Sequence, residues 1–246
     1  MGAGEVRRGV STPVVRAGSG PALSRGSISE AGQGTNDPRT SVEELMQELI
    51  LASTSPYRRR MLQDAGLAVR CEAPEVDERS FGHDAPDSPF ETAPERLATA
   101  LARAKAQAVA ARFPERWVLG ADQVAYDPEE PGAPFGKPEG PDDHLRRLRQ
   151  LAGREHRLVT GFALLGGPRE HVEAVTTRLT FRSDLTDDEL RAYVATGEGA
   201  GCAGGYAVEG RGAFLIERID GDLFNVIGLP LLQVITALRG AGWRFA

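Results

Sequence analysis

Serine and arginine side chains gather at a predicted helix start in the stretch LILASTSPYRRRMLQDAGL, residues 49–67. Ser55 followed by Pro56 is typical of a helix N-terminus, where serine caps the helix and proline occupies its first turn. Such an end offers unpaired backbone N–H groups and the positive end of the helix dipole to an anion. The hydroxyls of Ser53 and Ser55 and the arginines 58–60 would add to that attraction, so the stretch predicts a phosphate site.

The three consecutive arginines cannot all serve one ligand, because successive helical residues point about 100° apart. We expect one or two of them to bind the anion and the others to face solvent. The alternative is that Arg58, Arg59 and Arg60 form only a solvated helix face.

Asp122, in the run LGADQV, directly follows an apolar segment. An acid in that position is costly unless it is paired or does chemistry. We expect Asp122 at the end of a central strand, where it could hold a metal ion or orient a water molecule. A turn-capping aspartate is the alternative.

Further charged residues complete a set suited to phosphoryl chemistry. Asp77 and Glu78 lie in a predicted turn, PEVDE; Lys105 lies on an alanine-rich helix, and Lys137 sits in the Gly/Pro frame FGKPEG. Singly, each would be an ordinary surface charge. Together they supply carboxylates for a hard divalent cation and cations for the remaining phosphate charge.

Alternating strand and helix patterns must position these residues. Strands are expected at 49–52, 68–78, 116–126 (apolar up to Gly120 and interrupted there by an acid), 156–167, 175–183 and 213–221. Helices are expected at 56–65, 95–112, 141–151, from a capping box of Thr186 and Glu189 to Val194, and at 230–239. This alternation implies an α/β protein with a largely continuous sheet.

Motifs in a fixed order resemble the Maf family of nucleoside triphosphate pyrophosphatases from about Glu48 to the C-terminus. They are LILASTSPYRRRML, CEAPEVDE, AKAQAVA, GADQVAY, GKP, VTGFALL, LTDDELRAYVATGE, AGGYAVEGRGAFLIERIDGD and NVIGLPL. The resemblance implies an elongated mixed sheet flanked by helices, with two lobes around a central nucleotide cleft, of the Maf/ITPase-like type. It also implies a possible homodimer, and divalent-metal-dependent hydrolysis of a nucleoside triphosphate to the monophosphate and pyrophosphate.

The family's catalytic aspartate falls on Asp122, and the resemblance implies roles for five further polar residues. Expected to be catalytic are Asp122, Glu78 and Lys137; expected to bind substrate are Ser55, Arg58 and Lys105. Glu78 and Asp122 are expected to hold Mg²⁺ or Mn²⁺.

Three positions bear on which nucleotide base the protein recognises. Pyrimidine-preferring members have an arginine before the arginine that follows Ser-Pro, a threonine after the catalytic aspartate, and a glutamine in a late AYGIQG segment. This chain has Tyr57, Gln123 and Glu209 there, which is similar to the branch acting on 7-methyl-GTP. A carboxylate can accept both adjacent guanine N–H donors, and a cationic methylated base favours a carboxylate and an aromatic face.

Alternatives to the 7-methyl-GTP reading stay open. Tyr57 could be a packing residue and Glu209 an exposed hairpin residue, and AGGYAVEG is otherwise closer to the pyrimidine branch. A dTTP/UTP pyrophosphatase is therefore the alternative. From another class, a nucleotide-binding regulator of septum formation is the competing hypothesis, although intact Asp122, Glu78 and Lys137 favour turnover.

Composition restricts partners and compartment. The chain has 246 residues and a net charge of −6, which disfavours a surface for a nucleic acid polymer. No apolar run approaches the roughly 20 residues of a membrane span. Cys71 and Cys202 are far apart and form no CxxC, so we expect reduced cysteines in a cytoplasmic protein.

Residues 1–45 are rich in Gly, Ser, Pro and Arg and have almost no aliphatic periodicity. Such a segment buries too little apolar surface to offset its ordering entropy, so we expect a disordered extension before a domain spanning 46–246. A start codon assigned too far upstream, with Met46 as the natural beginning, is the other interpretation, and an organelle-targeting peptide is a third.

Overall fold

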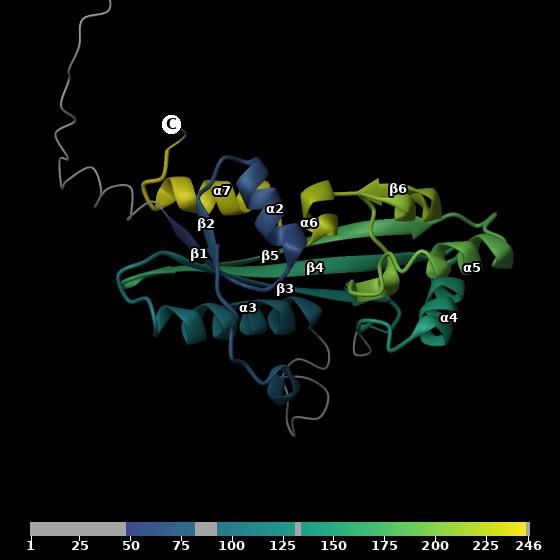
Figure 1. The fold of residues 1–246 in the computed structure, drawn as a ribbon, viewed down its shortest axis with the longest axis horizontal. Coiled ribbons are helices and arrows are strands. Elements are labelled where there is room, and N and C mark those ends of the chain that lie inside the picture. Colours follow the sequence, from purple (N-terminus) through teal and green to yellow (C-terminus); the bar gives the residue numbers. More distant parts are fainter. Residues whose placement is uncertain (1–47, 82–92, 131–133, 245–246) are drawn as a thin grey trace, which may run out of the picture. The chain divides into compact units, whose positions relative to one another are not determined.

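The computed structural model describes residues 48–81, 93–130 and 134–244. These residues form a six-stranded sheet in the order β2-β1-β3-β4-β5-β6 (Figure 1). β1 is parallel to β2 and β3, and the remaining neighbours are antiparallel. The strands are β1 (Leu49–Ala52), β2 (Val69–Cys71), β3 (Val118–Tyr126), β4 (Glu155–Gly166), β5 (Arg169–Phe181) and β6 (Ile216–Asp220).

Helices cover both faces of the sheet, which confirms the predicted mixed α/β architecture (Figure 1). They are α2 (Pro56–Asp64), α3 (Pro94–Ala110), α4 (Pro141–Leu151), α5 (Asp187–Ala195), α6 (Leu223–Ile227) and α7 (Leu231–Gly240), with 3₁₀ turns η1 (Glu78–Phe81), η2 (Ala203–Gly205) and η3 (Arg211–Leu215). α3 packs on one face against Ile50, Val118 and Ala163. α2 and α7 pack on the other, against Leu51 and Leu119.

The predicted helix signals are confirmed where they act locally. The Ser55 side chain caps α2 with Pro56 in the first turn, and both bonds of the Thr186–Glu189 capping box are present. Within the described residues, no helix is long and apolar enough to cross a membrane. The extension predicted over residues 1–45 lies outside the described residues.

Two glycines let α3 lie directly on the sheet. A Cβ at Gly120 of β3 would sit 2.7 Å from the backbone nitrogen of Ala106, and one at Gly161 of β4 would sit 2.5 Å from that of Thr99. Ordinary side chains at these two positions would hold the helix away. The close approach brings Lys105 of α3 down to the strand that carries Asp122.

Asp122 does not end a strand, contrary to the prediction. β3 continues to Tyr126 because β4 pairs with it along its whole length. On the other edge, β1 stops where Ala52 pairs with Gly120. Among the described residues, that edge of β3 pairs again only at the bridge between Ala125 and Phe135. Asp122 therefore lies mid-strand, just beyond the point where one neighbour ends.

Other predicted boundaries were wrong for related reasons. The strand predicted over 68–78 is limited to β2, and η3 occupies the start of the strand predicted over 213–221. β5 begins earlier than the predicted residue 175, because it forms a continuous hairpin with β4. The short helix α6 was not predicted.

Candidate active site

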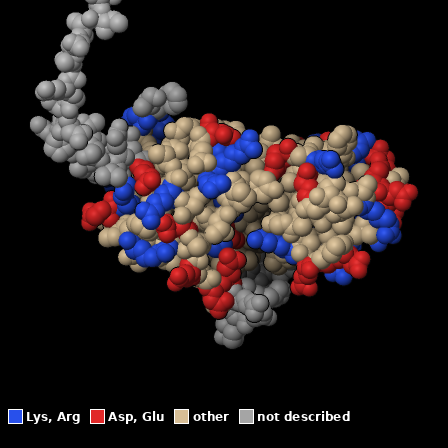
Figure 2. Space-filling model, in the orientation of Figure 1, with Lys and Arg blue, Asp and Glu red and all other residues tan. Residues whose placement is uncertain are grey.

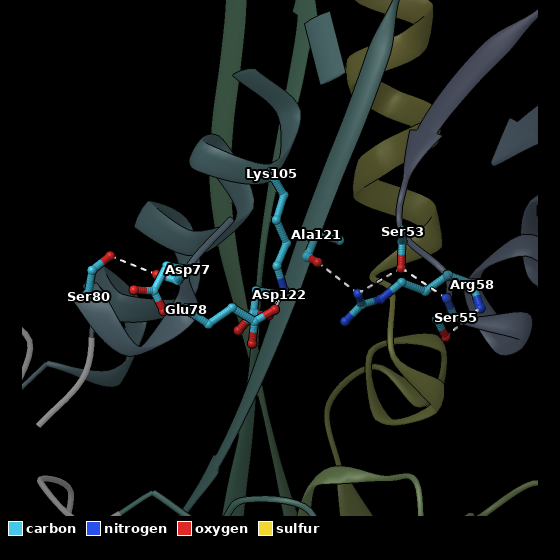
Figure 3. A network of polar contacts seen from close by, with 9 residues as sticks. All are labelled: Ser53, Ser55, Arg58, Asp77, Glu78, Ser80, Lys105, Ala121 and Asp122. Atoms are coloured by element: carbon cyan, nitrogen blue, oxygen red, sulfur yellow. Dashed lines mark hydrogen bonds and ion pairs between the residues drawn. The ribbon is translucent and has the colours of Figure 1, made fainter. Parts of the chain in front are cut away.

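Arg58 lies across the edge of β3 that β1 leaves unpaired. Its Nε donates to the carbonyl oxygen of Gly228 at 2.8 Å, and its Nη1 donates to that of Ala121 at 2.7 Å. Two serines shape the turn before it: Ser53 Oγ accepts from the Ser55 N–H at 3.2 Å, and Ser55 Oγ accepts from the Arg58 N–H at 3.4 Å. The guanidinium is thus fixed from three segments and points toward Asp122 (Figure 3).

The other two arginines face solvent, as one interpretation of the triplet predicted. Arg59 is exposed, and Arg60 pairs with Asp64 along the outside of α2 with an exposed side chain. Burial lowers the pKa of Arg58, while Asp122 and Glu78 act in the opposite direction. Among the described residues no acceptor is found for Arg58 Nη2, so its hydrogens are available to a ligand.

A buried ammonium joins two carboxylates on the α3 side of β3. Lys105 is 7% exposed, and its Nζ lies 2.6 Å from Asp122 Oδ1 and 2.7 Å from Glu78 Oε1. Burial raises the pKa of Asp122, partly offset by Lys105 and Arg58, and Glu78 raises it further. Figure 3 shows Glu78 reaching from η1 toward Asp122 while Arg58 approaches from the other side. We call Ser53, Ser55, Arg58, Glu78, Lys105 and Asp122 the charged cluster.

The charged cluster fits a hard divalent cation in its donor chemistry. Glu78 and Asp122 converge on one point, and carboxylate oxygens are the ligands that Mg²⁺ prefers. In the part of the chain that the structure describes, no group of three or more His, Cys, Asp or Glu could hold a metal ion. A Mg²⁺ held through one or two carboxylates, with water and substrate phosphates as further ligands, matches this arrangement.

Lys137 lies outside this cluster. The residue is exposed, and no bond or ion pair joins it to the described members of the charged cluster. Burial raises the pKa of Cys202, Glu209 adds to that rise, and the charge of Lys137 acts in the opposite direction. The structure therefore separates one residue expected to be catalytic from the other two, Glu78 and Asp122.

Tyr57 and Glu209 are brought together beside Cys202. Cys202 contributes most to the raised pKa of Tyr57, followed by partial burial and by Glu209. Partial desolvation also raises the pKa of Glu209, with a further contribution from Glu198. We call Tyr57, Lys137, Glu198, Cys202 and Glu209 the loop cluster. Figure 2 shows this face of the molecule hollowed where α2, β3 and the loop after α5 meet.

Gln123 faces the side of the sheet opposite Asp122. Its Nε2 donates to Thr160 Oγ1 at 3.0 Å and to the carbonyl oxygen of Asn225 in α6 at 2.6 Å. Both amide hydrogens are therefore used within the protein, and Oε1 is the polar atom left for a ligand. Asn225 accepts from Gln123, and Gly228 accepts from Arg58. Neither contact was predicted from the sequence, because both use backbone carbonyl groups, which every residue type carries.

Comparison with known proteins agrees with this geometry. Residues 48–241 match the family described as Maf-like protein. The chain belongs to the Maf family. It is 44% identical over 191 residues to a dTTP/UTP pyrophosphatase of Moorella thermoacetica, covering 77% of this chain and 92% of that protein. It is 40% identical over 196 residues to one of Thermus thermophilus, covering 80% and 96%.

Membership of the Maf family makes the chain a nucleotide pyrophosphatase, and hence a hydrolase, as predicted. A dTTP/UTP pyrophosphatase of Geobacillus sp. is a further relative, 37% identical over 80% of this chain and 100% of that protein. The names of these relatives match the predicted alternative better than the 7-methyl-GTP branch.

Proposed function

We propose that this Maf protein hydrolyses a nucleoside triphosphate between the α- and β-phosphorus atoms, releasing the monophosphate and pyrophosphate. The observation that carries the proposal is the meeting of Lys105, Asp122 and Glu78 opposite the guanidinium of Arg58. Phosphoryl transfer needs positioning and charge neutralisation more than covalent chemistry, and this set supplies both. We assign the activity to a domain spanning residues 46–246, in line with the family match over 48–241.

The proposed roles follow from the chemistry of each group. Glu78 and Asp122 would hold a divalent cation, which neutralises triphosphate charge and acidifies bound water. Asp122, whose pKa is raised chiefly by burial, is the proposed base for the attacking water. Arg58 Nη2 and the N–H groups that follow Ser55 would donate to phosphate oxygens.

The two lysines are proposed to act on the triphosphate as well. Lys105 would turn from the two carboxylates toward a phosphate oxygen when the substrate binds, since a buried ammonium keeps to a negative partner. The exposed Lys137 would neutralise the leaving pyrophosphate.

For the base, we propose dTTP and UTP as the preferred substrates, supported by the names of the relatives. A second candidate, 7-methyl-GTP, is favoured by the proximity of Tyr57 and Glu209. The partial desolvation that raises the pKa of Glu209 would be compensated by a cationic base stacked on Tyr57.

Pyrophosphate release, measured over a panel of nucleotides, tests both the proposed reaction and the proposed base preference. The full-length protein should release pyrophosphate with Mg²⁺ or Mn²⁺, and kcat/KM should rank dTTP and UTP above 7-methyl-GTP. The opposite ranking would favour the second candidate. Tight binding without release would favour a nucleotide-binding regulator.

Asp122→Asn keeps the side-chain size but removes the proposed base and metal ligand. We expect kcat/KM to fall on the order of 10³-fold. Asp184→Asn, in an exposed pair with Arg182, is the matched control and should retain full activity. Activity of Asp122→Asn equal to that of the native protein would contradict the mechanism.

A further inference from the structure

The loop that carries Glu209 is held by buried polar side chains at three successive residues. The ring of His144, from α4, bonds to the carbonyl oxygen of Gly205. His156 of β4 bonds through Nε2 to the hydroxyl of Tyr206 at 2.6 Å, and the hydroxyl of Tyr193 in α5 accepts from the Ala207 N–H at 3.1 Å.

A fourth contact holds the other end of the same loop. The carboxylate of Glu198 accepts from the N–H groups of Arg211 at 3.1 Å and Gly212 at 2.8 Å. The segment between these anchors contains Val208, Glu209 and Gly210. Glu209 therefore stands on a span of three residues pinned at both ends, even though its own side chain is exposed.

Packing alone does not explain why a histidine occupies position 156. It is fully buried, with its ring in edge contact with Tyr206 and Phe181 at 5.5 Å in both cases. Burial lowers its pKa to about 4, so it is neutral near pH 7. Its Nδ1 has no partner among the described residues, which leaves the bond to Tyr206 as the single hydrogen bond of the ring. An apolar side chain of similar size would avoid this desolvation cost.

The hydrogen bond between His156 and Tyr206 is directional, whereas apolar contact is not. Gly204 and Gly205 have φ values of +83° and +84°, a region that other residues rarely adopt, so the loop follows an unusual path into Tyr206. A Tyr206 ring held by packing alone could still rotate or slide in its pocket. A hydrogen bond at its far end fixes the ring, and with it the start of the segment that presents Glu209.

We propose that His156 and Tyr206 are positioning residues that set base selectivity by fixing the loop that carries Glu209. The inference deepens the proposed function and rests on it, because it takes Glu209 and Tyr57, the groups invoked for the second candidate, as the side chains that meet the base of any nucleotide bound there. It assigns His156 and Tyr206 no contact with the substrate. Turnover at the charged cluster should therefore not depend on them.

A double-mutant cycle tests the pair. Native protein, Tyr206→Phe, His156→Phe and the double variant are compared by kcat and KM for dTTP, UTP and 7-methyl-GTP. We expect each single variant to narrow the ratio of kcat/KM between preferred and disfavoured nucleotides by about five- to tenfold, through KM. The double variant should narrow this ratio no further, because each substitution removes the same hydrogen bond.

Phe181→Leu is the matched control, since the Phe181 ring packs edge-on against the Tyr206 ring, with the ring centroids 5.1 Å apart, and forms no hydrogen bond to it. It should lower Tm while leaving the selectivity ratio unchanged. An unchanged ratio in Tyr206→Phe, or an equal change in Phe181→Leu, would overturn the proposal.

Hydrogen exchange keeps this test separate from the proposed function. Amides 207–212 should exchange faster in Tyr206→Phe than in Phe181→Leu, even where the two have lost equal Tm. If native protein hydrolyses no nucleotide, the proposed function fails. Equal exchange in the two variants would then still overturn the positioning role.

Discussion

The charged cluster and the loop cluster are held in place in opposite ways. In the charged cluster, functional groups bind one another directly: Lys105 bridges Glu78 and Asp122. In the loop cluster, Tyr57 and Glu209 are exposed, and Glu209 is held through buried contacts beneath its loop. Glu78, Lys105 and Asp122 are held by their own charges, whereas Glu209 is held by the residues that support its loop.

This difference predicts how each region responds to change. Removing one member of a buried, charge-paired set leaves its partner unpaired in a low-dielectric site, which is costly. Removing one exposed side chain from a supported loop leaves the loop in place. Substitutions of Glu78, Lys105 or Asp122 should therefore lower the turnover of every nucleotide, whereas those of Tyr57 or Glu209 should redistribute turnover among nucleotides.

Lys105→Met should break the charged cluster most directly. Without the ammonium, Glu78 and Asp122 face each other without the cation that joins them, and we expect kcat/KM to fall about 10²-fold. Lys137→Met should lower kcat/KM by less, because Lys137 lies near Cys202 and outside the charged cluster. Steady-state kinetics of the two variants measures the difference. Equal losses of kcat/KM would show that Lys137 acts together with the charged cluster.

The buried His156 predicts a pH dependence of stability. Its folded-state pKa is about 4 and its ordinary value 6.5, so between these values the unfolded chain binds the extra proton. The free energy of unfolding should therefore fall as pH drops from about 6.5 to about 4, by up to about 3 kcal/mol. Asp127 is the charged neighbour that opposes this shift.

Urea unfolding near pH 7 and near pH 4.5 measures this dependence in native protein and in His156→Phe. The native protein should lose more stability than the variant, since acid effects of the other groups are common to both. The same loss in both proteins would contradict a buried neutral histidine.

Gly120→Ala tests whether the charged cluster depends on the close packing of α3 against the sheet. The added methyl would meet the backbone of Ala106 at 2.7 Å, and we expect a loss of about 1–3 kcal/mol together with reduced activity. Gly240→Ala, which meets nothing within 4 Å, is the control and should change neither. Native activity in Gly120→Ala would show that Lys105 does not need this close approach.

Glu209→Gln should give the smallest effect and the most selective one. It removes the charge but not the side chain, so turnover of 7-methyl-GTP should fall about tenfold relative to UTP, with kcat for UTP nearly unchanged. The ratio of kcat/KM for the two nucleotides is the measurement. A constant ratio would remove Glu209 from base recognition.

Much of the fold could be predicted because its signals are local. Ser55 and Pro56 begin α2, and Thr186 and Glu189 cap α5, since caps act within one helical turn. Strand pairing is not local. β3 runs past Asp122 because β4 continues beside it, and a pattern within residues 116–126 carries no record of that neighbour.

The amino-acid sequence shows which groups are available: a capped helix start, the carboxylates of Glu78 and Asp122, and lysines on defined elements. Which of these groups meet depends on how the chain folds in three dimensions. Lys105 reaches Asp122 because Gly120 and Gly161 admit α3 onto the sheet. Contacts between segments far apart in the chain depend on such approaches and on where each strand ends, and neither is encoded near the residues they join.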